Sequence, residues 1–477
     1  MRPRCALADD HRSLVAALRS ELADASVITD PDVMAAYSRD HAATVPSGIP
    51  IAVVAPTTSA EVAHVLAIVS GAATPVVTRG AGSGLSGGAN ALDGGIILSM
   101  HRLNAIIEID TQNLTVTTQA GVITADLKSA VNAHGLWYPP DPASAEVCSI
   151  GGNIATNAGG LCCVKYGVTR DYVLSLEVAL ADGRLVRLGR RTVKGVAGYD
   201  LASLIVGSEG TLGIVTSAML RLRPQPSPAR TLVATFRRAR DAGDVIAALA
   251  ARGIVPSLAE IIDRTTARIV EDWKRLDLDC DAGAHLLLQT DQPEQLASHE
   301  IDQMIAVVRS CGALDVYSSS DPNDSDALLM ARKLAFPALE RLGTCLLDDI
   351  AVPRSEVGAM IERIEEISTA HGLVIATFGH AGDGNLHPTL LFDPTDEQQR
   401  SSTQDAFDAI ILAALNLGGT CTGEHGVGGL KVDSLTKEVG IVGAELHHRI
   451  KRAFDPVGIL NPGRALPFDP GVTPQPS

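Results

Sequence analysis

The first 226 residues alternate helix-like and strand-like patterns of apolar positions. Apolar residues at helical spacing predict a helix over residues 11–25, and Asp30 followed by Pro31 predicts a short helix over residues 30–39. Further periodic segments predict helices over residues 62–70 and 125–134. Short apolar runs predict the strands, which cover residues 51–56, 74–78, 95–100, 106–110 and 115–119. This mixture indicates an α+β unit.

A proline-rich segment over residues 221–228 separates this unit from a second one. Beyond it the pattern predicts strands over 232–236, 256–262 and 286–290 and helices over 241–251 and 294–311, which is typical of a second α+β domain with an antiparallel sheet. We therefore expect four parts. They are a helical lead-in over 1–45, a first domain over 46–226, a second domain over 227–430, and a segment over 431–477 that returns to the first domain. The end of the chain, from residue 469, is predicted to be disordered.

Size and charge narrow the classes of protein to consider. A chain of 477 residues exceeds one hydrophobic core, so we expect two or three domains. The 39 Lys and Arg against 55 Asp and Glu give a net charge of −16, which argues against binding to nucleic acid or to an anionic membrane surface. The eight cysteines form no Cys-x-x-Cys pair and no iron–sulfur motif, and they fit a reducing cytosol. Without a signal peptide or an apolar run of membrane-spanning length, we expect a soluble, cytoplasmic protein.

The segment over residues 78–90 contains five glycines, where the 44 in the whole chain predict about one. An ordered glycine costs roughly 0.5–1 kcal/mol, and such a loop is kept where backbone N–H groups approach a ligand, most often an anionic phosphate. Predicted strands flank the loop on both sides, which excludes a Rossmann unit, and no Gly-Lys-Ser/Thr follows as in a P-loop. A flexible surface linker is the alternative interpretation.

Two further glycine-rich stretches favour the ligand interpretation. Between residues 139 and 167, three prolines precede the pairs Gly151-Gly152 and Gly159-Gly160, which we expect to form two turns that expose the backbone. Two asparagines lie between these pairs. A third stretch, over residues 206–215, has three glycines at the start of a predicted strand. Alone, the second stretch could be a rigid structural loop, but together the three favour a wall around a large planar ligand.

These three stretches, in this order, resemble the FAD-binding domain of the vanillyl-alcohol oxidase, or PCMH-type, flavoenzymes. The resemblance implies that residues 79–90 bind the diphosphate, residues 140–160 line the isoalloxazine and ribityl groups, and residues 207–215 bind the adenosine end. The implied cofactor-binding residues are Arg79, Gly80, Ala81, Gly82, Ser83, Gly84, Leu85, Ser86, Pro140, Asp141, Ser149, Gly151, Gly152, Asn153, Asn157, Gly159, Gly160, Tyr166, Gly167, Gly207, Glu209, Gly210, Thr211, Gly213, Ile214, Val215 and Asn461.

The same resemblance bears on how FAD is attached. Members that bind FAD covalently commonly have a histidine inside the first loop, and here that loop reads Ala81-Gly82-Ser83. We therefore expect non-covalent FAD, with a cysteinyl link through Cys148 as the alternative.

Two glycine-rich stretches in the last third of the chain carry candidate catalytic residues. FGHAGDGNLHP holds His380 and His387, and CTGEHGVGG holds Glu424 and His425. A lone histidine is most often a core residue, but two histidines and a carboxylate in glycine-rich turns, with a fourth position open, match the way catalytic zinc is held. Neighbouring side chains diverge, so we expect His425 to stay off this metal and to be free to act as a base. A structural metal site, the alternative, needs a fourth protein ligand, and none is evident.

From about residue 46 to its end, the chain is similar to the family of the glycolate oxidase flavin subunit and the D-lactate and D-2-hydroxyglutarate dehydrogenases. HAGDGNLH and GEHGVG resemble the signatures of that family. The resemblance implies a PCMH-type FAD-binding domain with an α+β cap domain, which is an α+β fold. It also implies that His380, His387 and Glu424 bind a divalent metal, usually zinc, and that His425 is the base.

Two more residues receive roles from the resemblance. Arg332 matches the arginine that binds the substrate carboxylate, a role that suits its bidentate fork. Asn385 is implied to lie near the substrate or the flavin. The implied reaction oxidises a 2-hydroxycarboxylate to the 2-oxo acid, with hydride transfer to flavin N5.

Substrate size follows from a comparison with relatives that act on 2-hydroxyglutarate. Those relatives carry a lysine where this chain has Leu347 and a small hydroxyl residue where it has Phe336. Two carboxylates, Asp348 and Asp349, follow Leu347, so a distal substrate carboxylate is disfavoured. We therefore expect D-lactate or glycolate to be preferred, with D-2-hydroxyglutarate dehydrogenase activity as the alternative.

The sequence leaves the electron acceptor open. It is a quinone, a cytochrome, another flavoprotein or an iron–sulfur subunit, and the chain could be the flavin subunit of a multi-subunit glycolate oxidase that is inactive without an iron–sulfur partner. A true oxidase that reacts with O₂, a homodimer, and peripheral attachment to a membrane through the acceptor also stay open. Ether-lipid synthases share the flavin fold, but the intact metal signature argues against that branch.

Overall fold

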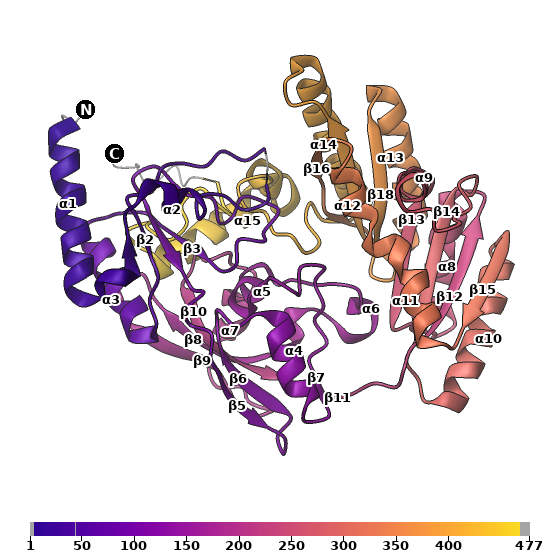
Figure 1. Cartoon of the computed structure of the whole chain (residues 1–477), viewed down its shortest axis with the longest axis horizontal. Helices are drawn as coiled ribbons and strands as arrows, with labels where there is room; N and C mark the ends of the chain where they lie inside the picture. The colour runs from indigo at the N-terminus through magenta and orange to yellow at the C-terminus, as the bar shows by residue number, and fades with distance from the viewer. Residues whose placement is uncertain (1–3, 43, 468–477) are drawn as a thin grey trace.

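The computed structural model describes residues 4–42 and 44–467, and the disorder expected from residue 469 lies outside these residues. Figure 1 shows two lobes, with both ends of the described chain in the same lobe. The segment after β11 (Arg223–Pro224) leads from the first lobe to the second. The domain boundaries at residues 45, 226 and 430 stay predictions.

The first lobe contains a four-stranded sheet with the order β1-β2-β4-β3. Strands β2 (Ala52–Val54), β4 (Ile96–Ser99) and β3 (Val76–Arg79) run parallel, and β1 (Val27–Ile28) is antiparallel to β2. The glycine-rich loop over residues 80–95 joins β3 to β4. The accompanying helices are α1 (Arg4–Glu21), η1 (Asp24–Ser26), α2 (Pro31–Ala35) and α3 (Ser59–Gly71). Asp30 caps α2 by accepting a hydrogen bond from Asp32 N, with Pro31 at the first helical position.

The same lobe has a five-stranded antiparallel sheet with the order β5-β6-β10-β8-β9. Its strands are β5 (Ile106–Asp110), β6 (Thr115–Gln119), β10 (Ile214–Arg221), β8 (Val173–Ala179) and β9 (Leu185–Gly189). The connecting elements are α4 (Thr124–Asn132), β7 (Leu136–Trp137), α5 (Ile150–Thr156), α6 (Cys163–Tyr166), η2 (Thr169–Tyr172) and α7 (Leu201–Ile205). One hydrophobic core joins both sheets, with Leu66 of α3, Leu98 of β4 and Leu220 of β10 among its fully buried members.

The second lobe is built on an eight-stranded antiparallel sheet with the order β15-β12-β14-β13-β18-β19-β16, and β17 also pairs with β19. The strands are β12 (Arg230–Phe236), β13 (Leu258–Asp263), β14 (Ala284–Thr290), β15 (Asp315–Ser319), β16 (Thr344–Leu347), β17 (Ile350–Ala351), β18 (Val374–His380) and β19 (Asn385–Phe392). Because side chains alternate between the two faces of a strand, this sheet has two separate apolar faces.

Helices cover both faces of this sheet. On one face, a core that includes Ile261 and Leu386 packs against α8 (Ala239–Ala251), α10 (Glu294–Ser310), α13 (Val357–His371) and α14 (Glu397–Asn416). On the other face, a smaller core that includes Ile262 and Phe378 packs against α9 (Arg264–Lys274) and α12 (Ala335–Glu340). The helix α11 (Pro322–Lys333) precedes α12, and η3 (Arg354–Glu356) precedes α13.

The C-terminal part of the chain returns to the first lobe (Figure 1). The helix α15 (Val432–Phe454) is kinked at Gly440, which has a φ of 72°. After it, the backbone of Ile459 and Asn461 makes two hydrogen bonds of 2.8 Å to Val76 of β3. No helix among the described residues is both long and apolar enough to cross a membrane.

The structure corrects one local prediction. Gly151 and Gly152, expected in an exposed turn, lie inside α5. Ser149 starts this helix by accepting a hydrogen bond from Gly152 N, and a Cβ on Gly151 would come within 2.9 Å of the Ala120 carbonyl oxygen. The cap and the close contact explain how two poor helix formers come to lie in a helix. The helix ends at Asn157, whose left-handed φ is 53°.

Candidate active site

The three predicted metal ligands converge on one point. His380 ends β18 and His387 lies on β19, with His387 paired to Phe378 in the ladder. Alternation along β18 puts His380 on the face that carries Phe378. Glu424 comes from the loop before α15, and its Oε1 lies 3.3 Å from His380 Nε2 and 3.5 Å from His387 Nε2. The ligand atoms of all three lie within 4.8 Å of one another.

The two histidines lie on strands, although the sequence suggested glycine-rich turns for both. The strands set the spacing of the histidines, because the antiparallel register holds their backbones at fixed positions. The Gly-Asp-Gly turn between them closes the hairpin, and only Glu424 comes from a loop without regular secondary structure.

A second carboxylate stands behind each histidine ring. Glu260 Oε1 lies 2.6 Å from His380 Nδ1, and Asp349 Oδ1 lies 3.7 Å from His387 Nδ1. In both rings Nε2 therefore faces Glu424, while Nδ1 faces a buried acid. Metal-binding histidines in proteins are commonly oriented by a carboxylate on the other ring nitrogen. This donor set fits a divalent metal.

The charges of Glu424 and His387 are consistent with the same use, whereas burial lowers the pKa of His380 but Glu260 and Glu424 outweigh it and raise that pKa well above its usual value. Burial raises the pKa of Glu424, but the neighbouring His380, His387 and His425 outweigh it and lower that pKa to about 2. Burial and the other two histidines hold the pKa of His387 well below its usual value. An ionised carboxylate and a neutral imidazole are the forms that bind a metal.

His425 is closer to the metal ligands than the sequence suggested. Its Nε2 lies 3.9 Å from Glu424 Oε1, and its ring stacks on that of His387 with the centroids 5.0 Å apart. The expectation that the side chains of Glu424 and His425 diverge is therefore wrong. The following Gly426 has a φ of 85°, a conformation that bends the loop and that few other residues adopt.

Asp349 fixes the loop that carries Glu424 and His425, a role that was not predicted from the sequence. Its Oδ2 accepts hydrogen bonds of 2.8–2.9 Å from the Thr422 hydroxyl and from three consecutive backbone N–H groups, those of residues 423–425. Burial raises the pKa of Asp349, but His425, Lys431 and His387 outweigh it and hold that pKa well below its usual value. Two adjacent acids after an apolar strand were the available signal, because buried charges need partners.

Glu209 holds the same loop from the first lobe. Its two carboxylate oxygens accept hydrogen bonds of 2.8 Å from Val427 N and Gly428 N. Burial raises the pKa of Glu209 to about 7. Glu209 was predicted to bind the cofactor, which stays a prediction; its carboxylate contacts the loop that carries Glu424 and His425. Asn461, also predicted to bind the cofactor, donates to the carbonyl oxygens of Gly88 and Glu209 at 2.9 Å and joins these segments.

The three glycine-rich stretches meet one another and the candidate metal site. A Cβ on Gly80 would collide with Ser149, and one on Gly210 would come within 3.7 Å of Thr78. A Cβ on Gly159 would lie 2.6 Å from Glu424 Oε2. The predicted flavin wall and a predicted metal ligand are therefore in direct contact, and any larger residue at position 159 would push Glu424 away.

Several other predicted cofactor residues use their side chains within the protein. Asp141 pairs with Lys128, Asn153 Nδ2 donates to Thr124 at 2.8 Å, and Asn157 Oδ1 accepts from Arg170 N at 2.9 Å. Arg79 Nη1 donates to the Arg39 carbonyl oxygen at 2.8 Å, and Tyr166 donates its hydroxyl to Asp291 of the second lobe.

The two predicted substrate-binding residues lie beside the predicted metal ligands. Arg332, near the end of α11, is buried, with its guanidinium 4.8 Å above the Phe378 ring and its Nε 2.6 Å from Glu260 Oε2. Asn385 donates to Asp349 Oδ1 at 2.7 Å and to the Ile350 carbonyl oxygen at 2.9 Å. The Asn385 amide therefore contacts Asp349, the residue that holds the loop carrying Glu424 and His425.

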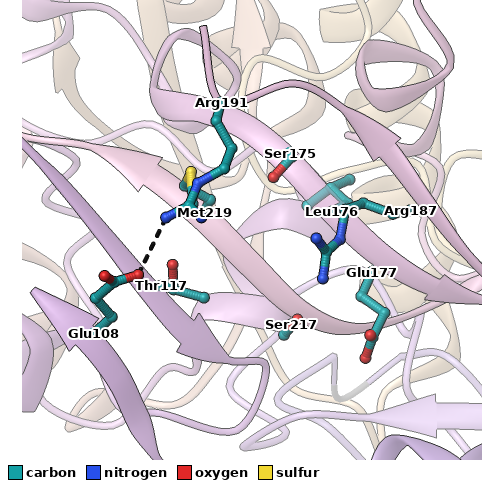
Figure 2. A pocket seen from close by; sticks show the side chains of 9 residues that line it. All are labelled: Glu108, Thr117, Ser175, Leu176, Glu177, Arg187, Arg191, Ser217 and Met219. Atoms are coloured by element: carbon teal, nitrogen blue, oxygen red, sulfur yellow. Dashed lines mark hydrogen bonds and ion pairs between the residues drawn. The ribbon is translucent and has the colours of Figure 1, made fainter. Parts of the chain in front are cut away.

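A separate hollow of about 200 Å³ lies on the face of the five-stranded sheet that points away from the core. Figure 2 shows the ion pair between Glu108 and Arg191, at 3.2 Å, among its lining residues. None of the predicted site residues lines this hollow.

The fold and the site together define an FAD-dependent oxidoreductase with a PCMH-type fold. p-Cresol methylhydroxylase superposes with a TM-score of 0.78 at 18% identity, covering 96% of this chain and 97% of that one. 4-Ethylphenol oxidase from Gulosibacter chungangensis gives 0.79 at 19% identity, covering 97% and 98%. The model of the FAD binding domain matches residues 50–189, and that of FAD linked oxidases, C-terminal domain, matches residues 225–465.

The chain belongs to the FAD-linked oxidase family, in the branch that contains glycolate oxidase subunits and D-lactate dehydrogenases. Glycolate oxidase subunit GlcD of Bacillus subtilis is 43% identical over 88% of this chain and 90% of its own length. GlcD of Escherichia coli K12 is 35% identical, covering 96% and 92%. D-lactate dehydrogenase of Archaeoglobus fulgidus is 36% identical, covering 87% and 91%. The predicted family resemblance, fold class and enzyme class are thereby confirmed.

We expect FAD to separate intact from the denatured protein. The first loop offers no histidine, and Cys148 is buried with its Sγ 3.3 Å from Thr124 Oγ1. Acid or heat denaturation followed by centrifugation should leave the flavin fluorescence in the supernatant. Flavin that stays with the polypeptide, and is released when Cys148 is replaced by alanine, would establish the covalent alternative.

Proposed function

We propose that this enzyme oxidises a small 2-hydroxycarboxylate to the 2-oxo acid, using FAD and a divalent metal held by His380, His387 and Glu424. The observation that carries the proposal is the contact between Glu424 and Gly159. It brings the metal ligand set against the stretch expected to line the flavin, so a substrate can touch both. The names of the relatives, glycolate oxidase subunit and D-lactate dehydrogenase, support the same substrate class.

When bound, FAD would supply the two-electron acceptor, and a metal held by His380, His387 and Glu424, with zinc as the first candidate, would polarise the substrate hydroxyl. The protein residues orient the substrate between them. Arg332 has its Nε engaged by Glu260 and one face on Phe378, so its two Nη groups form the edge that would bind a carboxylate. His425, beside Glu424, takes the hydroxyl proton as general base.

We propose that electrons leave through another protein or a quinone. The two GlcD relatives are named as subunits, which supports a partner subunit as the acceptor. The described cysteines are free and give no clustered set of four for an iron–sulfur centre in this chain. A cytochrome or another flavoprotein would fill the same role, and a homodimer is compatible with each.

Reduction of an artificial dye under anaerobic conditions tests this function. Purified protein loaded with FAD and Zn²⁺ should reduce the dye with D-lactate or glycolate and release the 2-oxo acid. Reduction that needs a co-purified iron–sulfur subunit would identify the multi-subunit alternative, and hydrogen peroxide in air would identify an oxidase. No reaction with any 2-hydroxy acid under all of these conditions would contradict the proposal.

We expect kcat/KM for D-lactate or glycolate to exceed that for D-2-hydroxyglutarate by about tenfold or more. Leu347 and Phe336 both pack against the apolar cluster that contains Phe378, the residue under Arg332. Lys431, a buried ammonium group of the catalytic loop, is paired with Asp348 at 2.7 Å. A second substrate carboxylate would therefore lose hydration without gaining a cation, at a cost of at least about 1.4 kcal/mol. A higher kcat/KM for D-2-hydroxyglutarate would overturn the assignment of Leu347.

A further inference from the structure

Glu260 has no exposed surface, and it lies in the middle of β13, in the sequence Leu-Ala-Glu-Ile-Ile-Asp. Its neighbours Ala259 and Ile261 belong to the core on one face of the sheet, so alternation directs Glu260 to the opposite face. That is the face of His380 and Phe378. An acid in an otherwise apolar buried strand calls for a specific partner, because an unpaired buried carboxylate is strongly disfavoured.

Glu260 has two partners, one on each oxygen. Oε1 lies 2.6 Å from Nδ1 of His380, and Oε2 lies 2.6 Å from Nε of Arg332. The first partner comes from β18 and the second from α11, two elements that are about 40 residues apart in sequence. Glu260 is thus a single rigid bridge between a proposed metal ligand and the proposed carboxylate-binding residue.

Each contact restricts its partner in a way that the reaction requires. A hydrogen bond donated by His380 Nδ1–H to Glu260 fixes the tautomer that leaves Nε2 free to face Glu424. The ion pair with Glu260 and the Phe378 ring on one face hold the Arg332 guanidinium in place from two directions. Stability alone does not explain the arrangement, because apolar residues of similar volume commonly stabilise a core at least as well as a buried ion pair.

We propose that Glu260 is a positioning residue that sets the metal ligand His380 and the substrate-binding Arg332 at a fixed separation. The inference deepens the proposed function and rests on it. The metal and the arginine hold the hydroxyl and the carboxylate of one small molecule, so an error in their separation misplaces the hydrogen to be removed. Misplacement of about 1 Å can cost about 10²-fold in rate.

Glu260→Gln is the decisive variant, because it keeps the volume of the side chain and removes one acceptor. An amide has a single oxygen, so either His380 or Arg332 must face the NH₂ group and lose its contact. We expect a 10- to 100-fold loss of Zn²⁺ affinity if His380 loses the contact, or a rise in KM of about tenfold at saturating Zn²⁺ if Arg332 does. Glu260→Ala should show both effects.

Asp263→Asn provides the matched control. Asp263 is a buried acid on the same strand, but it accepts from Thr266 N at 2.7 Å and Thr377 N at 3.0 Å and touches none of the site residues. Its replacement should affect thermal stability without changing Zn²⁺ affinity or KM. If Glu260→Gln does not fold, Glu260→Asp serves instead, because it keeps the charge but is one methylene too short to reach both partners.

Zn²⁺ affinity is measured without substrate, by competition with a chromophoric chelator on the FAD-loaded protein, and KM and kcat with D-lactate and a dye. Folded Glu260→Gln or Glu260→Asp protein with Zn²⁺ affinity and KM within threefold of the unmodified protein would overturn the positioning role. Unmodified protein that binds no Zn²⁺, or oxidises no 2-hydroxy acid, would instead contradict the proposed function. The two failures are therefore distinguishable.

Discussion

His387→Ala is expected to abolish turnover of the 2-hydroxy acid, by about 10³-fold or more, while FAD stays bound. The ring of His387 is buried and presents Nε2 to Glu424 at 3.5 Å. Loss of a metal that stabilises developing charge costs several kcal/mol, and about 4 kcal/mol corresponds to 10³-fold. His380→Ala and Glu424→Ala should behave in the same way. Metal content is measured by elemental analysis and FAD content by absorbance.

His285→Gln is the matched control for this prediction. His285 is also a buried histidine on a strand of the second lobe, but its Nε2 contacts the Asp279 carbonyl oxygen at 2.9 Å and not the site. Chelation of the unmodified protein should remove turnover, and Zn²⁺ should restore it. An active preparation without metal, or a fully active His387→Ala variant, would contradict the metal role.

His425→Ala is expected to keep the metal and to lower kcat by about 10²-fold or more. General-base catalysis contributes about 10²- to 10⁴-fold, and His425 is the histidine next to the ligand set that the proposal leaves free for this work. Its backbone N–H donates to Asp349 at 2.9 Å, and alanine retains that bond, so the loop should keep its shape. Stopped-flow measurement of flavin reduction by D-lactate isolates the chemical step.

The structure makes a second outcome of this variant informative. His425, His387 and Asp349 also form a set whose ligand atoms lie within 4.8 Å of one another. Loss of bound metal in His425→Ala would therefore assign His425 to the metal and move the base role elsewhere. Flavin reduction at the unmodified rate with metal retained would rule out the base role of His425.

The sequence predicted the fold class and the convergence of His380, His387 and Glu424. Short glycine-rich motifs that contain several histidine and carboxylate side chains can be identified from the local sequence alone. It could not predict which buried acids support them. Glu260 is 120 residues from His380, and Asp349 is about 75 residues from the loop it holds, so only the tertiary fold brings them together. No local pattern encodes such long-range pairings.

Two local predictions failed for a similar reason. Gly151 and Gly152 have low helix propensity, but the cap at Ser149 and the contact with Ala120 outweigh it. Glu424 and His425 were expected to diverge, but stacking on His387 brings the second ring back toward the first carboxylate. In each case contacts with residues distant in sequence, and not the preferences of the adjacent residues, determine the conformation.

The loop over residues 422–428 is held by Asp349 of one lobe and by Glu209 of the other. These contacts limit how the substrate can enter and the product can leave the site. Rotation of the lobes away from each other would break several buried hydrogen bonds to carboxylates, each worth about 1.5–3 kcal/mol. Such an opening would dismantle the catalytic loop on every cycle. Substrate and product are therefore expected to exchange without separation of the two lobes.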